Sequence, residues 1–415
     1  MRILIIPLAS KIHGEKYCLK ILGQYAKVFS KYNVKPYERL ITSLSEAEEV
    51  MEEASGSNVH LIILTLTGGT SRLATEIASG NPNPVLIVAH GEHNSLPSAL
   101  SSYNRLRNAG KRAKILFSHS PSGIDSTLGL HLRALKIIRE LSRARIALVN
   151  LSEVPEYARI LSRKFGFEIT PIPEEVLLKE VETISDDEAL ENLRKKLGEK
   201  EAGLNEKVLV KISRLYLALR RILEKNSCSA LAMECFNFIQ KHGYTPCLPV
   251  AWLLDEGIPA ACEADLYSLV LLIIAQKISG KPGWMANLAS LYNERILLAH
   301  CTVPTLLCNS YSLVEHFESG KPYSISGLFQ ATRATISRLS IDLREIYIDC
   351  ADVNAPVKLD ANQCRTQVFA RLHKTKLSNL LDLALGNHHV IIAGDYRGLL
   401  GAIAYHLNIK RVPLE

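Results

Sequence analysis

The residues best suited to holding a divalent metal ion lie in the second half of the sequence, beside apolar runs that predict buried strands. Two oxygen donors and two imidazole donors are available there. Such a set suits Mn²⁺ and similar divalent ions better than a site built for thiolate ligands. The candidates are Glu263, Asn287, His300 and one of the neighbours His388 and His389. The chemistry indicated is metal-assisted, with Mn²⁺ or a similar ion as the expected cofactor.

Glu263 and Asp265 follow the sequence Gly-Ile-Pro-Ala-Ala-Cys at the end of a predicted strand. Ligands of α/β folds bind at the carboxyl ends of such strands. The chain around Glu263 is apolar, and a buried carboxylate needs a partner, which favours a functional role. Asp265 has two interpretations of equal weight: a second acid, or the N-cap of a helix that begins at Leu266.

The histidines are the least specific members of the set. His300 ends an apolar strand, where a lone histidine is more often structural than ligating, and we interpret the adjacent Cys301 as buried packing. His388 and His389 precede a buried strand, so one ring points inward and the other outward. No single motif is specific, and the hypothesis rests on the combination.

Two further motifs could contact a substrate. His316 and Glu318 could orient one another or hold a sugar hydroxyl, although a polar loop ending at Gly320 explains them equally well. The sequence Thr67-Gly68-Gly69-Thr70 opens a helix after a strand, and could bind an anion or polyol or serve as a structural turn. It lacks the lysine of a P-loop and the spacing of a dinucleotide motif, which argues against a nucleotide cofactor.

Alternating strands and helices position these residues. Apolar runs predict a first α/β domain over residues 1–111 and a second over 112–298, in which Ala113–Phe117 begins a new βαβ unit. A charged helical excursion interrupts the second domain near 171–206. Short strands separated by turns predict a β-rich domain over 299–415. The expected fold class is α/β, with two Rossmann-like parallel-sheet domains followed by a β-rich C-terminal domain.

Composition excludes several classes of protein. The 415 residues carry a net charge of only +7, without a basic–aromatic motif, so no nucleic-acid partner is expected. The most apolar stretches are too short to span a bilayer, and the N-terminal run lacks a cleavage site, so neither a membrane segment nor a signal peptide is expected. Nine scattered cysteines fit reduced thiols in a cytoplasmic protein.

The order of motifs resembles that of L-fucose isomerase-like proteins, within the L-fucose/L-arabinose isomerase superfamily. The resemblance covers most of the chain and is densest from about 230 to 330. It also includes the N-terminal residues 67–70 and 93–99, and the latter adds Asn94 to the substrate-binding candidates. The motifs that carry the resemblance in the second half are Cys262-Glu263-Ala264-Asp265, Met285-Ala286-Asn287, Ala299-His300-Cys301-Thr302-Val303-Pro304, His316-Phe317-Glu318-Ser319-Gly320 and Asn387-His388-His389.

The resemblance implies a divalent-metal aldose–ketose isomerase, an intramolecular oxidoreductase that moves a proton between C1 and C2 through an enediol. By motif, Glu263 would be both a metal ligand and a member of the proton shuttle, and His389 is the favoured histidine of the pair. Well-studied members have a second carboxylate where this chain has Asn287, and an amide cannot act as the base. This is typical of an offshoot subfamily in which Asp265 or Glu318 takes the second acid/base role.

The resulting hypothesis is a metal-dependent isomerase of a small sugar. By resemblance alone it would be a homo-oligomer with active sites between subunits. An epimerase, lyase or aldolase could use the same site, and the missing second carboxylate would also fit a non-catalytic sugar-binding protein on the same scaffold.

Overall fold

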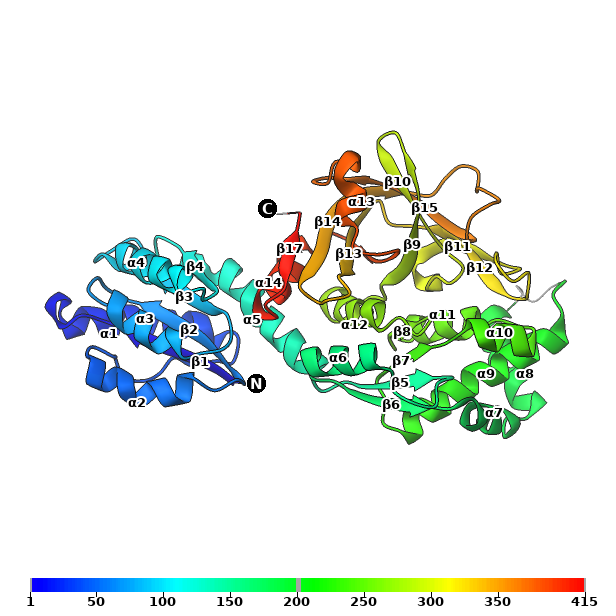
Figure 1. Ribbon diagram of the computed structural model, residues 1–415, viewed down its shortest axis with the longest axis horizontal. Helices are drawn as coiled ribbons and strands as arrows, with labels where there is room; N and C mark the ends of the chain where they lie inside the picture. Colours follow the sequence, from blue (N-terminus) through cyan, green and yellow to red (C-terminus); the bar gives the residue numbers. More distant parts are fainter. Residues whose placement is uncertain (1, 199–202, 414–415) are drawn as a thin grey trace. The chain divides into compact units, whose positions relative to one another are not determined.

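A computed structural model describes residues 2–198 and 203–413 of the chain (Figure 1). The chain is divided into two compact units, each of which is described separately. The first comprises Met1–Lys136 and Ala402–Ile409, and the second comprises Ile137–Gly401 and Lys410–Glu415.

The first unit is built on a four-stranded parallel sheet in the order β1-β2-β3-β4. Its apolar strands are covered by helices on both faces, because successive side chains point in opposite directions. Ile6 and Ile63 belong to one hydrophobic cluster, and Ile5 and Ile62 to the other. The elements are β1 (Arg2–Leu8), α1 (Glu15–Ser30), α2 (Leu44–Ala54), β2 (Val59–Thr65), α3 (Ser71–Ser79), β3 (Val85–Ala89), α4 (Ser95–Asn108) and β4 (Ala113–Phe117).

The second unit begins with another four-stranded parallel sheet, in the order β6-β5-β7-β8. β4 was predicted to begin this unit, but it pairs with β3 in the first sheet, and α5 (Asp125–Leu141) leads onward to β5. The elements are β5 (Arg145–Val149), α6 (Glu156–Phe165), β6 (Glu168–Ile172), α7 (Glu174–Glu182), α8 (Asp186–Leu197), α9 (Glu206–Lys225), β7 (Ala230–Met233), α10 (Phe236–His242), α11 (Cys247–Asp255), β8 (Ala260–Ala261) and α12 (Leu266–Ser279).

A closed antiparallel barrel of six strands follows in the same unit. Its order is β13-β16-β9-β10-β15-β14, and pairing of β13 with β14 closes it, while β17 extends β14 in parallel. The elements are β9 (Trp284–Tyr292), β10 (Arg295–His300), the hairpin β11 (Cys308–Val314) and β12 (Ser324–Phe329), β13 (Arg333–Leu339), β14 (Glu345–Asn354), β15 (Thr366–Leu372), α13 (Leu380–Leu383), β16 (His388–Ala393) and β17 (Lys410–Val412). Helix α14 (Arg397–His406) begins in this unit, and its residues from Ala402 onward belong to the first.

The predicted fold class is confirmed: two parallel sheets with interleaved helices precede a β-barrel. The predicted domain boundaries stay predictions, and the barrel strands begin at Trp284. The predicted charged excursion contains α7 and α8, and its residues 199–202 lie outside the described part of the chain.

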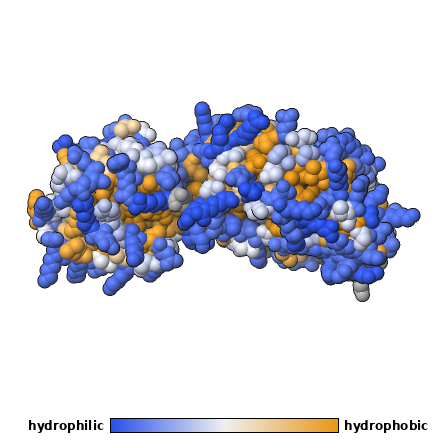
Figure 2. Space-filling view, turned by 90° about the horizontal axis from the view of Figure 1, so that it is seen from below, coloured by the Kyte–Doolittle hydropathy of each residue, from blue (hydrophilic) through white to orange (hydrophobic). Residues whose placement is uncertain are grey.

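Hydrophilic side chains occupy most of the face shown in Figure 2, with smaller apolar patches between them. Within residues 2–198 and 203–413, no helix combines the length and the apolarity needed to cross a membrane. The apolar helix α12 is instead buried, and it contacts β16, β13 and β8. It therefore joins the second sheet to the barrel around the site described next.

Candidate metal centre

Glu263 lies in a tight turn between β8 and α12. Both Glu263 and Ala264 have positive φ angles, 59° and 49°, a conformation that non-glycine residues rarely adopt. The turn is held by hydrogen bonds from the Ala264 N–H to the Met233 carbonyl and from the Asp265 N–H to the Cys262 carbonyl. Backbone strain of this kind is concentrated at functional sites, and here it sets the position of the Glu263 carboxylate at the sheet edge.

The barrel supplies the other donors from three adjacent strands. His300 is the last residue of β10, and His388 is the first of β16. Between them lies β9, whose Asn287 pairs with His388 on one side and with Ala299 on the other. Antiparallel pairing thus brings residues that are about a hundred positions apart to one end of the barrel.

Glu263, His300 and His388 converge on one point. Glu263 Oε1 lies 3.7 Å from His300 Nε2 and 3.5 Å from His388 Nε2. One ligand atom from each of the three residues lies within 4.8 Å of the other two. His388 Nε2 is buried and has no hydrogen-bond partner among the described residues. An orphaned imidazole nitrogen facing a carboxylate fits a divalent ion, so this cluster could bind one.

Burial disfavours charge on the side chains of the cluster, and close partners of opposite charge offset this effect. Burial opposes ionisation of Glu263, yet the nearby imidazoles of His300 and His388 lower its pKa to about 2. Burial likewise disfavours a charged His388, but its hydrogen bond to Asp265 and the nearby charge of Glu263 raise its pKa to about 9. A metal ion bound here would take the place of the proton on His388 Nε2.

Asp265 contacts the cluster through Nδ1 of His388, the ring nitrogen that does not face Glu263. Its Oδ1 accepts the Ser268 N–H at 2.9 Å, so it is the N-cap of α12, and its Oδ2 accepts His388 Nδ1–H at the same distance. Arg338 Nη1 donates to Oδ2 at 3.1 Å. Burial raises the pKa of Asp265, but His388 and Arg338 together hold it well below its usual range. The structure therefore gives Asp265 the capping role and a contact with a candidate ligand.

His389 lies outside the cluster, contrary to our sequence-based preference. Neighbours on a strand face opposite ways, so the ring of His389 points away from His388. Its Nδ1 lies 3.2 Å from the Asn387 carbonyl, and its ring packs edge-on against Tyr347. Burial lowers its pKa to about 4. The residue that joins Glu263 and His300 is His388.

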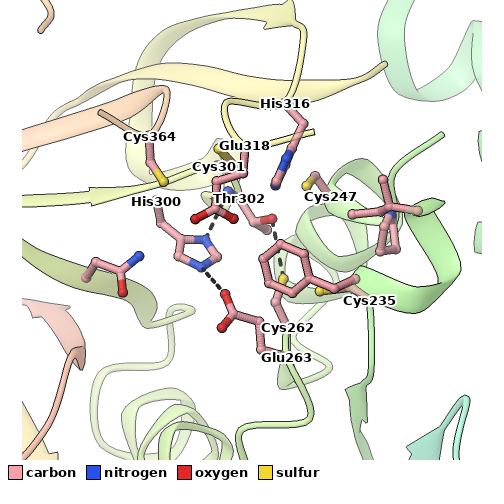
Figure 3. A pocket seen from close by; sticks show the side chains of 14 residues that line it. Cys235, Cys247, Cys262, Glu263, His300, Cys301, Thr302, His316, Glu318 and Cys364 are labelled. Atoms are coloured by element: carbon pink, nitrogen blue, oxygen red, sulfur yellow. Dashed lines mark hydrogen bonds and ion pairs between the residues drawn. The ribbon is translucent and has the colours of Figure 1, made fainter. Parts of the chain in front are cut away.

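A cavity of about 30 Å³ opens beside Glu263 and His300 (Figure 3). Five of the nine cysteines reach its wall, which could not be predicted from the sequence because the cysteines are scattered along the chain. Cys301, interpreted as packing, is indeed 3% exposed. The lining residues are Cys235, Phe236, Ile239, Pro246, Cys247, Cys262, Glu263, Asn287, His300, Cys301, Thr302, His316, Glu318 and Cys364.

The predicted substrate residues His316 and Glu318 lie on the opposite wall of this cavity. His316 is buried, and its Nδ1 accepts the Ser319 N–H at 3.3 Å. Glu318 is exposed and also lines the larger hollow that continues outward over Phe236 and Lys321. A carboxylate thus faces the cluster from the solvent side, whereas Asp265 does not reach the cavity.

The predicted substrate residues of the first unit form a cluster of their own. Thr67 and Thr70 are buried, and their hydroxyls bond to Ser10 N–H and Ser98 respectively. A Cβ on Gly68 would lie 2.8 Å from the Cβ of Asn94, so only glycine allows this approach. The hydrogen bonds explain a structural turn, and substrate binding by Thr67, Gly68, Gly69, Thr70 and Asn94 stays a prediction.

Comparison with known proteins points to sugar isomerases at low identity, although no protein-family model matches the chain. The sulfoquinovose isomerase of Clostridium sp. (strain MSTE9) is 24% identical over 271 residues, which are 60% of this chain and 60% of that relative. The sulfoquinovose isomerase of Alkalicoccus urumqiensis is 20% identical over 313 residues, 68% of this chain and 67% of the relative. The chain is therefore a distant homologue of these sugar isomerases.

Proposed function

We propose that this protein is a metal-dependent aldose–ketose isomerase, with a divalent ion such as Mn²⁺ held at the cluster of Glu263, His300 and His388. The observation that supports this most directly is the convergence of their three ligand atoms, with one imidazole nitrogen that has no hydrogen-bond partner among the described residues. Asn287 lines the same cavity and offers a further oxygen. The distant sulfoquinovose isomerases support the choice of a sugar as substrate.

When bound, the ion would polarise the carbonyl and hydroxyl oxygens of the sugar. Glu263 stays ionised because of its low pKa, so it offsets the charge of the ion and is a weak proton acceptor. Glu318 faces the same cavity from the solvent side and is the better candidate to carry a proton between C1 and C2. It would take the place of the carboxylate that Asn287 cannot supply.

The first experiment measures metal content and turnover on the same protein. Elemental analysis before and after chelation, and thermal melting with added Mn²⁺, should reveal one tightly held divalent ion per chain. Glu263→Ala should lose the ion. Incubation with a panel of aldoses and ketoses that includes sulfoquinovose should give the isomeric sugar, identified by chromatography.

Other outcomes would contradict the proposal in different ways. Epimers or cleavage products would mean that the same site carries out a different reaction. Stoichiometric sugar binding without turnover would support a binding protein. If no divalent ion binds, the proposed site is wrong.

A further inference from the structure

The two histidines of the metal centre differ in what their Nδ1 atoms contact. His388 Nδ1 lies 2.9 Å from the Asp265 carboxylate, which can only accept a hydrogen bond when ionised. His300 Nδ1 lies 3.1 Å from the backbone N–H of Thr302, which can only donate. His388 Nδ1 must therefore carry a proton, whereas His300 Nδ1 must be an acceptor.

A neutral imidazole has one N–H, so the contact at Nδ1 decides the state of Nε2. In His388 the proton on Nδ1 leaves the Nε2 lone pair free to bind a metal. In His300 the proton must lie on Nε2, the atom that faces Glu263 Oε1 at 3.7 Å. A protonated nitrogen has no lone pair to offer an ion.

We propose that, within the metal site of the proposed function, His388 is the imidazole ligand and His300 is a hydrogen-bond donor. His300 Nε2–H would donate to Glu263 and, when substrate is present, to a sugar oxygen. Asp265 is then a positioning residue, because it acts through His388 by fixing which ring nitrogen carries the proton. A carboxylate behind a metal-bound histidine commonly has this effect.

Asp265 is well suited to this role because its own position is fixed. Besides His388, its carboxylate accepts hydrogen bonds from the Ser268 N–H, from Ser268 Oγ at 2.7 Å and from Arg338 at 3.1 Å. The side chains of Asp265 and Arg338 are 10% and 7% exposed. The buried guanidinium offsets the charge of the carboxylate, which favours an ionised acceptor behind His388.

The direct test counts coordinated imidazoles. Metal-free protein is loaded with Mn²⁺, and pulsed EPR is compared between protein with natural histidine and protein with ¹⁵N-labelled histidine. One coordinated imidazole is expected in the parent and in His300→Gln, whose amide can still donate a hydrogen bond. His388→Gln should lose the signal, and calorimetry should show at least about 100-fold weaker Mn²⁺ binding, while His300→Gln stays within about threefold of the parent.

The role of Asp265 is tested with Asp265→Asn. Asparagine still caps α12, but its amide N–H₂ would face His388 Nδ1 and move the ring proton to Nε2. Mn²⁺ binding should weaken by about 10- to 100-fold. The melting temperature of the metal-free protein should fall because the buried Arg338 loses its charge partner, so Mn²⁺ binding is measured at a temperature at which the variant is folded. Ser268→Ala is the matched control, since it removes a different hydrogen bond to the same carboxylate and should leave Mn²⁺ affinity within about threefold.

If Asp265→Asn does not fold, Asp265→Ser replaces it, because serine caps the helix but cannot reach His388; the same loss of affinity is expected. Two coordinated imidazoles in the parent, or loss of the signal in His300→Gln, would overturn this proposal and leave the proposed metal site standing. Unchanged affinity in a folded Asp265 variant would overturn the positioning role. If the parent binds no Mn²⁺, the proposed function fails, and this proposal fails with it.

Discussion

At the scale of single residues, Glu318 is the acid whose role is easiest to separate from metal binding. It is exposed at the cavity wall, whereas Glu263 belongs to the cluster itself. Glu318→Gln should lower kcat by about 10²- to 10⁴-fold because the amide cannot transfer a proton. Mn²⁺ affinity, measured by calorimetry, should not change.

The control for this variant is Glu315→Gln, which changes an exposed carboxylate in the same loop. Glu315 does not line the cavity, so its replacement should leave kcat near that of the parent. Equal losses in the two variants would mean that the charge of the loop matters and that Glu318 has no specific role.

The sequence predicted part of this site for physical reasons that can be traced residue by residue. Glu263 and His300 stand out because each polar side chain ends an apolar run. The choice between His388 and His389 could not be made, since every residue from 388 to 392 is buried and neither face of the strand is marked by polarity. Asp265 both caps α12 and accepts a hydrogen bond from His388. The second role could not be predicted, because His388 lies near Asp265 only in the folded protein.

At the scale of secondary-structure elements, the packing of α12 against the barrel determines where the strand of His388 lies. Gly283 precedes β9 at this contact, and a Cβ there would lie 2.9 Å from the Cβ of Ala275 and 3.1 Å from Val390. Gly283→Ala should lower the free energy of unfolding by about 1–3 kcal/mol, because added volume in a packed interior forces its neighbours apart. Urea unfolding measures this change.

Replacing a second glycine, Gly23, should instead stabilise the protein. Gly23 lies on the exposed side of α1, and a Cβ there would have no neighbour within 4 Å among the described residues. Gly23→Ala should raise the free energy of unfolding by about 0.5–1 kcal/mol, because alanine loses less backbone entropy in a helix. A loss of stability in this variant would mean that a side chain at this position of α1 collides with a neighbour.

Individual elements were easier to predict than their partners. The run Ala113–Phe117 is a strand, as predicted, but the run itself contains nothing that specifies β3 as its neighbour. Strand pairing depends on tertiary packing, whereas a strand's existence is visible in its own apolar pattern. For the same reason β9 and β10 were not grouped with the strands of the barrel.

At the scale of the whole molecule, buried histidines make stability depend on pH. His60, His131 and His406 pack edge-on in the first unit, and His131 Nδ1 lies 3.1 Å from His406 Nε2. Burial lowers the pKa of His60 and of His131 to about 4, and that of His406 falls as well. All three are therefore neutral in the folded protein near pH 7.

The direction in which stability changes with pH follows from the number of protons that the folded and unfolded states bind. An unfolded histidine has a pKa of about 6.5, so between about pH 6.5 and pH 4 the unfolded chain binds more protons than the folded one. Stability is complete above this window and falls with decreasing pH, by at most about 1.4 kcal/mol per pH unit for each histidine. Urea unfolding between pH 7 and pH 4.5 should show this decrease in the free energy of unfolding. In His60→Phe the decrease per pH unit should be smaller by the contribution of one histidine. An unchanged slope would contradict this account.

The path of the chain determines whether cleavage can separate the two units. The chain passes from one unit to the other after Lys136, again after Gly401 and a third time after Ile409. The first unit thus obtains Tyr405, whose hydroxyl donates to the Val85 carbonyl at 2.8 Å, from the far end of the polypeptide. A proteolytic nick after Lys136 would not release two independent pieces, because the first would still need a segment that the second carries. Two such fragments, produced separately, should reassociate by complementation.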